Sequence, residues 1–110
     1  MALFGVPVLG MAGTLHETVY TGKGLAFIPE HYIDLDYSDE GMLITREHEA
    51  KDPEEAARRA VRVAREGMAT SISGKPFPIR AESYCIHSDT PNAVALAETV
   101  TQALQPWLAA

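Results

Sequence analysis

Short apolar runs alternate with amphipathic stretches along the chain, a pattern that predicts β-strands alternating with α-helices. Strands are predicted at Val6–Leu9, Leu25–Ile28 and Glu82–Ile86, with a short helix over Thr14–Tyr20 between the first two. Such alternation favours an α/β protein with a largely parallel sheet. Three parallel strands would leave two unpaired edges, which natural proteins avoid. We therefore expect this chain to form part of a larger structure, such as a barrel.

Two longer helices are predicted in the second half of the chain. The first begins after Asp52, because Asp52 suits an N-cap, Pro53 suits the first helical position, and Glu55 completes a capping-box spacing. Gly67 predicts its end. The last helix is predicted to open at Thr90–Pro91. Its expected buried face consists of Val94, Ala97, Val100 and Leu104.

Two less regular segments separate these elements. The segment Tyr32–Thr45 contains the turn signal Ser38–Gly41, followed by the apolar residues Met42, Leu43 and Ile44. The segment Ser71–Phe77 predicts a small loop or hairpin.

Composition and charge narrow the classes of function. The net charge is −6, and the densest group of arginines shares a helix with glutamates, so a nucleic-acid surface is not expected. The longest apolar stretch, Met1–Ala12, is too short to span a bilayer, and no Lys or Arg precedes Lys23 as a secretion signal would require. Cys85 is the single cysteine, which excludes an internal disulfide and fits a reducing compartment. We therefore predict a cytoplasmic location and no membrane partner.

The run Cys85–Pro91 is the strongest candidate for chemistry, because it lies where a predicted strand ends and a helix begins. Ligands of α/β proteins bind at such strand ends, and a helix N-terminus there attracts anions. His87 can exchange a proton near neutral pH, and Asp89 can orient it or bind a metal. The alternative is that Asp89 or Thr90 only caps the helix and His87 is a packed residue. Cys85 is expected to be a small core residue rather than a nucleophile.

A second candidate run, Glu30–Tyr37, follows a predicted strand and is rich in carboxylates. In an extended run, Asp34 would face away from Ile33 and Leu35, which makes it a candidate site residue. The alternative is that these acids are solvated loop residues. His16 and Glu17 are adjacent, but no third ligand has suitable spacing, so no metal site is predicted.

These runs together resemble the LamB/YcsF family. The run Cys85–Pro91 is similar to that family's Cys-Val-His-Gly-Asp-Thr-Pro motif. Upstream, Glu30–Tyr37 resembles its Glu-x-Phe-x-Asp-Arg-x-Tyr segment, and Asp39–Leu43 resembles its Asp-Gly-x-Leu. Asp52–Ala56 and Arg65–Ser71 follow in the family's order, and the resemblance extends from about Val6 to Leu104.

The resemblance implies both a fold and an activity. Residues 1–110 would form one C-terminal segment of a seven-stranded, deacetylase-like β/α barrel, and so an incomplete barrel. The implied activity is that of the A subunit of a 5-oxoprolinase, which opens the 5-oxoproline lactam to glutamate with ATP, expected with Mg²⁺, and with partner B and C subunits. The expected catalytic residues are His87, Asp89 and Asp34, and the expected substrate-binding residues are Glu30 and Thr90.

Departures from the family pattern keep other functions open. Leu35 stands where the family has Arg, and Ser88 replaces Gly. The family's Asp-x-Asn-x-Asp-x-Gly-Glu and Lys-Pro-His-Gly segments have no match, so an N-terminal half is expected as a further partner. One alternative is a non-catalytic interaction remnant of the fold. The other is a deacetylase-like carbon–nitrogen hydrolase, whose metal site of one Asp and two His cannot be assembled from His16, His31, His48 and His87.

Overall fold

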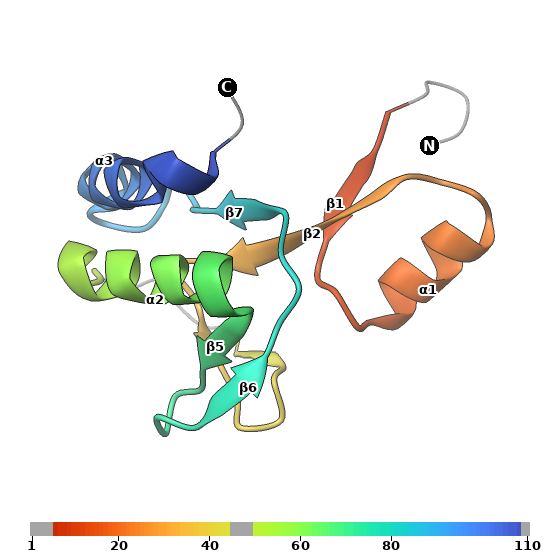
Figure 1. Cartoon of the computed structure of the whole chain (residues 1–110), viewed down its shortest axis with the longest axis horizontal. Helices are drawn as coiled ribbons and strands as arrows, with labels where there is room; N and C mark the ends of the chain where they lie inside the picture. Colours follow the sequence, from red (N-terminus) through yellow and green to blue (C-terminus); the bar gives the residue numbers. More distant parts are fainter. Residues whose placement is uncertain (1–5, 45–49, 109–110) are drawn as a thin grey trace.

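A parallel three-stranded sheet organises the protein, and the computed structural model describes residues 6–44 and 50–108 of it. Its strands are β1 (Val8–Gly10), β2 (Phe27–Tyr32) and β7 (Ser83–Cys85), in the order β1-β2-β7 (Figure 1). Strand β1 pairs with the first half of β2, and β7 pairs with the second half. The predicted parallel α/β arrangement is confirmed.

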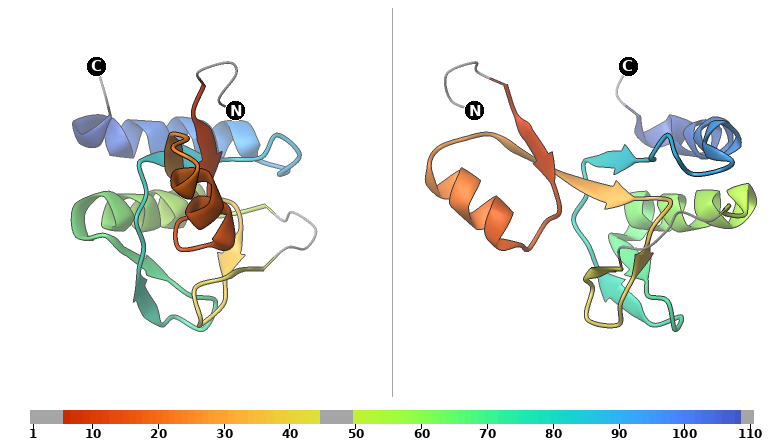
Figure 2. Two further views of the ribbon diagram at one scale, coloured as in Figure 1. Left: turned by 90° about the vertical axis from the view of Figure 1, so that its right-hand side faces the viewer. Right: turned by 180° about the vertical axis from the view of Figure 1, so that it is seen from behind.

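Two helices cover the β2–β7 part of the sheet. Helices α2 (Pro53–Glu66) and α3 (Ala93–Leu104) pack side by side, and a 3-10 turn, η2 (Gln105–Trp107), follows α3 (Figure 2). The alanines of α2 permit a close approach of α3, because the distance between packed helices depends on side-chain size. The core cluster contains Ile33, Ala56, Ala57, Ala60, Leu96, Val100 and Leu104.

The buried face of α3 differs from the predicted one. Val94 is 73% exposed, whereas Leu96 is fully buried and shares a stripe of spacing four with Val100 and Leu104. The helix also begins later than predicted, at Ala93. Its N-cap residue, Asn92, uses its side chain to bind the backbone N–H and C=O of Lys51. This pair of hydrogen bonds joins the start of α3 to the segment before α2.

The limits of α2 follow the sequence prediction. The Asp52 side chain accepts a hydrogen bond from the Glu54 N–H at 3.2 Å, and Pro53 occupies the first turn. Gly67 adopts φ 67°, a left-handed conformation that glycine adopts without steric cost. Glu55 does not complete the capping box, because its carboxylate binds Arg58 at 2.6 Å and Arg59 at 2.9 Å instead.

Two antiparallel ribbons complete the part below α2 (Figure 1). The first pairs β3 (Asp36–Tyr37) with β4 (Leu43–Ile44). The second pairs β5 (Met68–Thr70) with β6 (Pro76–Pro78) and confirms the predicted hairpin. Within the first ribbon, the predicted turn is closed by the Gly41 N–H donating to the Ser38 carbonyl at 2.9 Å.

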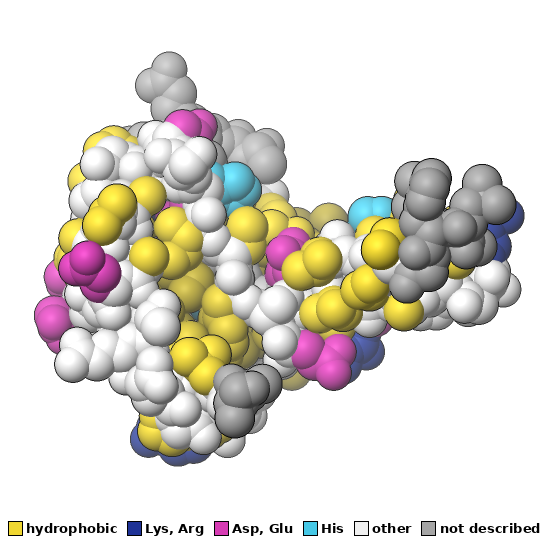
Figure 3. All heavy atoms as spheres, turned by 90° about the horizontal axis from the view of Figure 1, so that it is seen from above, with side chains coloured by type: hydrophobic (Ala, Val, Ile, Leu, Met, Phe, Trp, Pro, Cys, Tyr) yellow, Lys and Arg dark blue, Asp and Glu magenta, His cyan; other side chains and the backbone are white. Residues whose placement is uncertain are grey.

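Strand β1 and helix α1 (Leu15–Gly22) form an arm that projects from the rest of the protein, here called the β1–α1 arm (Figures 2 and 3). Helix α1 contains no buried residue. Large apolar side chains are exposed along the arm, and Figure 3 shows several of them together. They are Val6, Leu9, Leu15 and Val19, with exposed fractions of 49–81%. Across the described residues, 6–44 and 50–108, β1 pairs with β2 alone.

No helix in the described part of the chain is long and apolar enough to cross a membrane.

His31 is buried on the face of β2 that points toward the helices. Its ring stacks on Tyr37 at 5.8 Å and meets Tyr84 edge-on at 5.7 Å between centroids. Burial, with a contribution from the positive charge of Arg59, lowers the pKa of His31 to about 4. Within the described residues, its Nδ1 has no hydrogen-bond partner. His31 is therefore a neutral core residue, and protonation would place an uncompensated charge in the core.

Asp52→Ala should lower the free energy of unfolding by about 0.5–2 kcal/mol, because it removes the α2 N-cap and a favourable charge at the helix N-terminus. Urea denaturation would measure the change. Asp52→Asn is the matched control, since Asn caps as well as Asp. Equal midpoints for the Ala variant and the original chain would show that Asp52 does not cap α2.

Stability should fall as the pH falls from about 6.5 toward 4, because unfolded His31 binds a proton there and folded His31 does not. The contribution of neutral His31 to the free energy of unfolding is fully present above pH ~6.5, and roughly 3 kcal/mol of it is lost near pH 4. Urea midpoints between pH 4 and 7 would measure it. His31→Phe should flatten the dependence, with the exposed His16→Ala variant as control. An unchanged slope in His31→Phe would contradict the assignment.

Candidate active site

A buried carboxylate, Asp34, joins the ends of two neighbouring strands. It lies in the turn that follows β2 and is 1% exposed. Its Oδ2 accepts hydrogen bonds from the His87 N–H at 2.6 Å and from Thr90 Oγ1 at 2.6 Å. Its Oδ1 lies 2.9 Å from His87 Nδ1. Both donor residues follow β7, whose carboxyl end lies beside that of β2 because the two strands are parallel.

The hydrogen bonds keep Asp34 ionised. Burial raises the pKa of this carboxyl, but the hydrogen bonds from Thr90 and His87 outweigh it, so the net pKa lies below the ordinary value. Three donors satisfy the charge that burial removes from water. The alternative of a solvated loop acid is therefore wrong for Asp34.

The ionised Asp34 also determines the tautomer of His87. A carboxylate can only accept hydrogen bonds, so Nδ1 of His87 must carry the proton in this pair, and the basic lone pair lies on Nε2. The His87 side chain is 36% exposed, which allows a small molecule to reach it. This carboxylate–imidazole arrangement is the one that enzymes use to orient a general base.

The other predicted residues of the Cys85–Pro91 run have different positions. Thr90 is 2% exposed, and its hydroxyl is bonded to Asp34, so it supports the carboxylate instead of facing a substrate. Asp89 is exposed, while the carboxylate that binds Nδ1 of His87 belongs to Asp34. Neither Asp89 nor Thr90 is the N-cap of α3, because that position belongs to Asn92.

Three backbone N–H groups around this helix start are used within the run and its neighbours. The Thr90 N–H donates to the His87 carbonyl, and the Ala93 N–H donates to the Thr90 carbonyl. The His87 N–H donates to Asp34. These three donors are therefore not offered to an anion.

Glu30, Tyr32 and Cys85 share the sheet face opposite the helices. Side chains alternate along β2, and Tyr32 stands opposite Cys85 in the register. Burial and a hydrogen bond to the Glu30 side chain raise the pKa of Tyr32. Burial and the charges of Glu30 and Asp34 raise the pKa of the Cys85 thiol. A raised pKa disfavours the thiolate, which supports a packing role for Cys85.

Two tyrosines near the pair carry structural roles that the sequence did not reveal. The Tyr32 ring stacks on the His87 ring with centroids 6.3 Å apart and an angle of 14°. The buried Tyr37 hydroxyl accepts a hydrogen bond from the Tyr32 N–H at 3.1 Å. The sequence signal that could have identified these tyrosines is their position, because one lies two residues before Asp34 and the other lies three residues after it.

The three histidines that the structure describes, His16, His31 and His87, do not form a cluster. His16 packs against Tyr20 and Phe27, and His31 lies in the core. His48 lies outside the described residues. Among the residues that the structure describes, no group of three His, Cys, Asp or Glu side chains could hold a metal ion.

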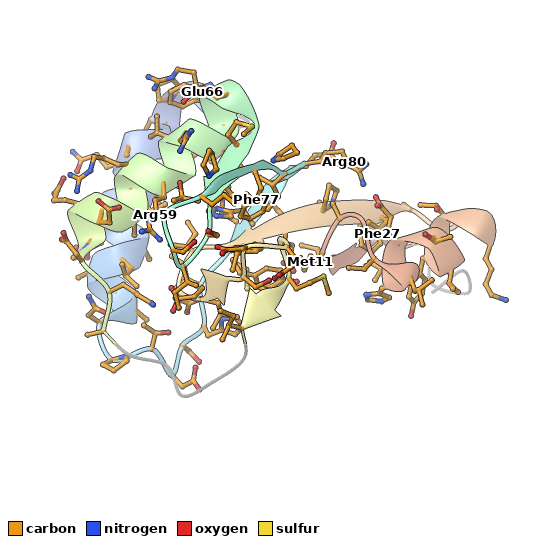
Figure 4. All side chains as sticks on the ribbon, turned by 90° about the horizontal axis from the view of Figure 1, so that it is seen from below. Met11, Phe27, Arg59, Glu66, Phe77 and Arg80 are labelled. Atoms are coloured by element: carbon orange, nitrogen blue, oxygen red, sulfur yellow. The ribbon has the colours of Figure 1, made fainter. Side chains whose placement is uncertain are left out.

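An open cleft of about 570 Å³ lies between the β1–α1 arm and the ribbons. Its lining includes Met11, Phe77 and Arg80, which Figure 4 labels. Arg80 is paired with Glu17 of α1. Neither Asp34 nor His87 lines this cleft, so its size does not make it the centre of the chemistry described above.

The fold and site define an α/β protein with a carboxylate–imidazole pair at the carboxyl ends of parallel strands. Residues 3–107 match the LamB/YcsF family, and the chain belongs to it. The A subunit of a 5-oxoprolinase from Streptomyces avermitilis is 38% identical over 91% of this chain and 41% of that protein. The corresponding protein from Thermus thermophilus is 38% identical over 92% of this chain and 42% of its own length.

A solved structure also matches this chain. The crystal structure of a lactam utilization protein from Thermus thermophilus matches with a TM-score of 0.80 and 35% identity, over 93% of this chain and 41% of that one. The chain thus spans about two fifths of the length of the relatives it matches. The resemblance seen in the sequence is confirmed.

Asp34→Asn should move the His87 proton from Nδ1 to Nε2. The carbonyl oxygen of the introduced Asn can accept the hydrogen bonds from the His87 N–H and from Thr90, so that its amide N–H group points at His87 Nδ1. Nδ1 must then accept a hydrogen bond, and the ring proton moves to Nε2. Nitrogen-15 NMR of the imidazole would distinguish the two tautomers. Asp39→Asn is the control, because it removes an exposed carboxylate elsewhere. A retained Nδ1–H tautomer in Asp34→Asn would contradict the assigned pair.

Proposed function

We propose that this chain is the C-terminal part of the A subunit of an ATP-dependent 5-oxoprolinase, which opens the 5-oxoproline lactam to glutamate. The observation that carries the proposal is the buried Asp34–His87 pair at the strand ends. The relatives that bear the name of 5-oxoprolinase A subunits support the substrate class.

His87 is the general base in this proposal. Ring opening adds a water oxygen to the lactam carbonyl carbon, breaks the C–N bond and protonates the departing nitrogen. His87 Nε2 takes the proton from the attacking water and returns it to that nitrogen. Asp34 keeps the imidazole in the required tautomer and stabilises its protonated form.

Glu30 is proposed as a substrate contact. It lies on the same sheet face as Tyr32, next to the pair, and its carboxylate can accept a hydrogen bond from the lactam N–H. Thr90 is assigned a supporting role, and Asp89 remains a predicted catalytic residue at the exposed end of the run.

ATP enters the proposal through the family resemblance, with Mg²⁺. Among the described residues, the His87, Thr90 and Ala93 N–H groups are already bonded, and the cations Lys51 and Arg59 are paired with Asp36 and Glu55. We therefore derive no step through ATP. Its contacts are assigned to residues outside those described, in an N-terminal half or in B and C subunits.

An incomplete barrel is the proposed architecture of residues 1–110. Two observations support it: the chain spans about two fifths of its relatives, and the β1–α1 arm exposes apolar side chains beside an open strand edge. A further strand along β1 would cover that edge. A cytoplasmic location is part of the proposal and is supported by the unpaired Cys85.

The chain alone should release no glutamate from 5-oxoproline and ATP, because it spans about 41% of the Streptomyces relative. Activity should appear when residues 6–108 replace the matching part of the Thermus thermophilus relative, assayed with B and C subunits. Glutamate production by the isolated chain would contradict the need for completion. A folded but inactive chimera would instead favour the non-catalytic remnant.

Within an active chimera, His87→Ala should lower kcat by on the order of 10²–10⁴-fold, the usual contribution of a general base. Asp89→Asn should also lower the rate if Asp89 belongs to the machinery, with little change in stability. Asp39→Asn is the control, because that carboxylate binds Ser71 and Ser73 in the hairpin region, away from the pair. Full activity in both site variants would refute this site.

A further inference from the structure

Tyr32 is held in place from several directions before any ligand binds. It is the last residue of β2, and its N–H donates to the Tyr37 hydroxyl. Its ring lies nearly parallel to the His87 ring, with an interplanar angle of 14°. The β2–β7 ladder fixes the distance between the two backbones, because Tyr32 pairs with Cys85, two residues before His87.

Asp34 alone does not fix the plane of the imidazole. A hydrogen bond to Nδ1 restrains that atom, but the ring can still tilt about the bond. A second flat ring parallel to it restricts the tilt, and a centroid separation of 6.3 Å lies within the range of offset aromatic stacks.

We propose that Tyr32 is a positioning residue whose ring sets the plane of His87 for lactam opening. The inference rests on the proposed function for its catalytic consequence, but the contact between the rings can be tested without activity. The contact with His87 is made by the ring of Tyr32, so the ring carries the effect. A Phe at this position should therefore preserve the effect, whereas an aliphatic residue should not.

The first test is NMR of the His87 ring protons in the chain itself. Tyr32→Leu should shift the Hδ2 and Hε1 resonances of His87, because an aliphatic side chain has no ring current and no flat surface that restricts the imidazole. Tyr32→Phe should keep the original resonances. Tyr32→Ile is a second aliphatic variant, because a β-branched residue suits a strand if Leu impairs folding. The charged neighbours Asp34, Glu30 and Asp89 are the same in every variant.

Equal His87 ring resonances in the original chain and in a folded aliphatic variant would overturn the proposal. The second test uses the active chimera. Tyr32→Leu should lower kcat roughly tenfold or more with a smaller change in KM, since misorientation of a catalytic group mainly affects the chemical step. Tyr32→Phe should restore kcat.

The two tests separate this inference from the function on which it rests. Shifted His87 resonances in Tyr32→Leu together with an inactive chimera would support the ring contact and refute the lactam chemistry. An active chimera in which Tyr32→Leu leaves kcat unchanged would refute the positioning role alone.

Discussion

The hydrogen bonds to Asp34 are the interaction on which the site depends. A buried carboxylate is stable only when donors replace the water it loses, and here all three donors come from residues that follow β7. The turn after β2 and the loop before α3 are therefore joined by the hydrogen bonds to the Asp34 carboxylate. The same contacts that satisfy Asp34 also bring His87 to the strand ends and fix its tautomer.

The alternation of side chains along β2 explains how one short strand serves both core and site. His31 and Ile33, which is two positions further along the chain, lie toward the helices. There they pack on aromatic and aliphatic side chains. Glu30 and Tyr32 lie on the other face, beside Cys85 and His87. A shift of one residue in the register would exchange the two faces and bury Glu30, so the core fixes the geometry of the site.

The sequence predicted the parts that depend on local signals. The parallel strands, the limits of α2 and the hairpin at Ser71–Phe77 follow from periodicity, capping residues and glycine. The partner of His87 was not predictable, because Asp34 is 53 residues away while Asp89 is close to His87 in sequence. Val100 and Leu104 were correctly predicted to be buried. The first part of the α3 face was assigned wrongly because Val94, Ala95, Leu96 and Ala97 are all apolar and give no periodic contrast.

Asp34, His87 and Thr90 satisfy one another at the carboxyl ends of β2 and β7. The β1–α1 arm lies at the other half of β2 and exposes apolar side chains, and within the described residues β1 pairs with β2 alone. Lys51 and Arg59, two cations of the described residues, are bound to Asp36 and Glu55. The orientation of His87 is thus preformed by contacts of this chain itself, whereas the edge of β1 is open to a further strand in the part of the chain that the structure describes.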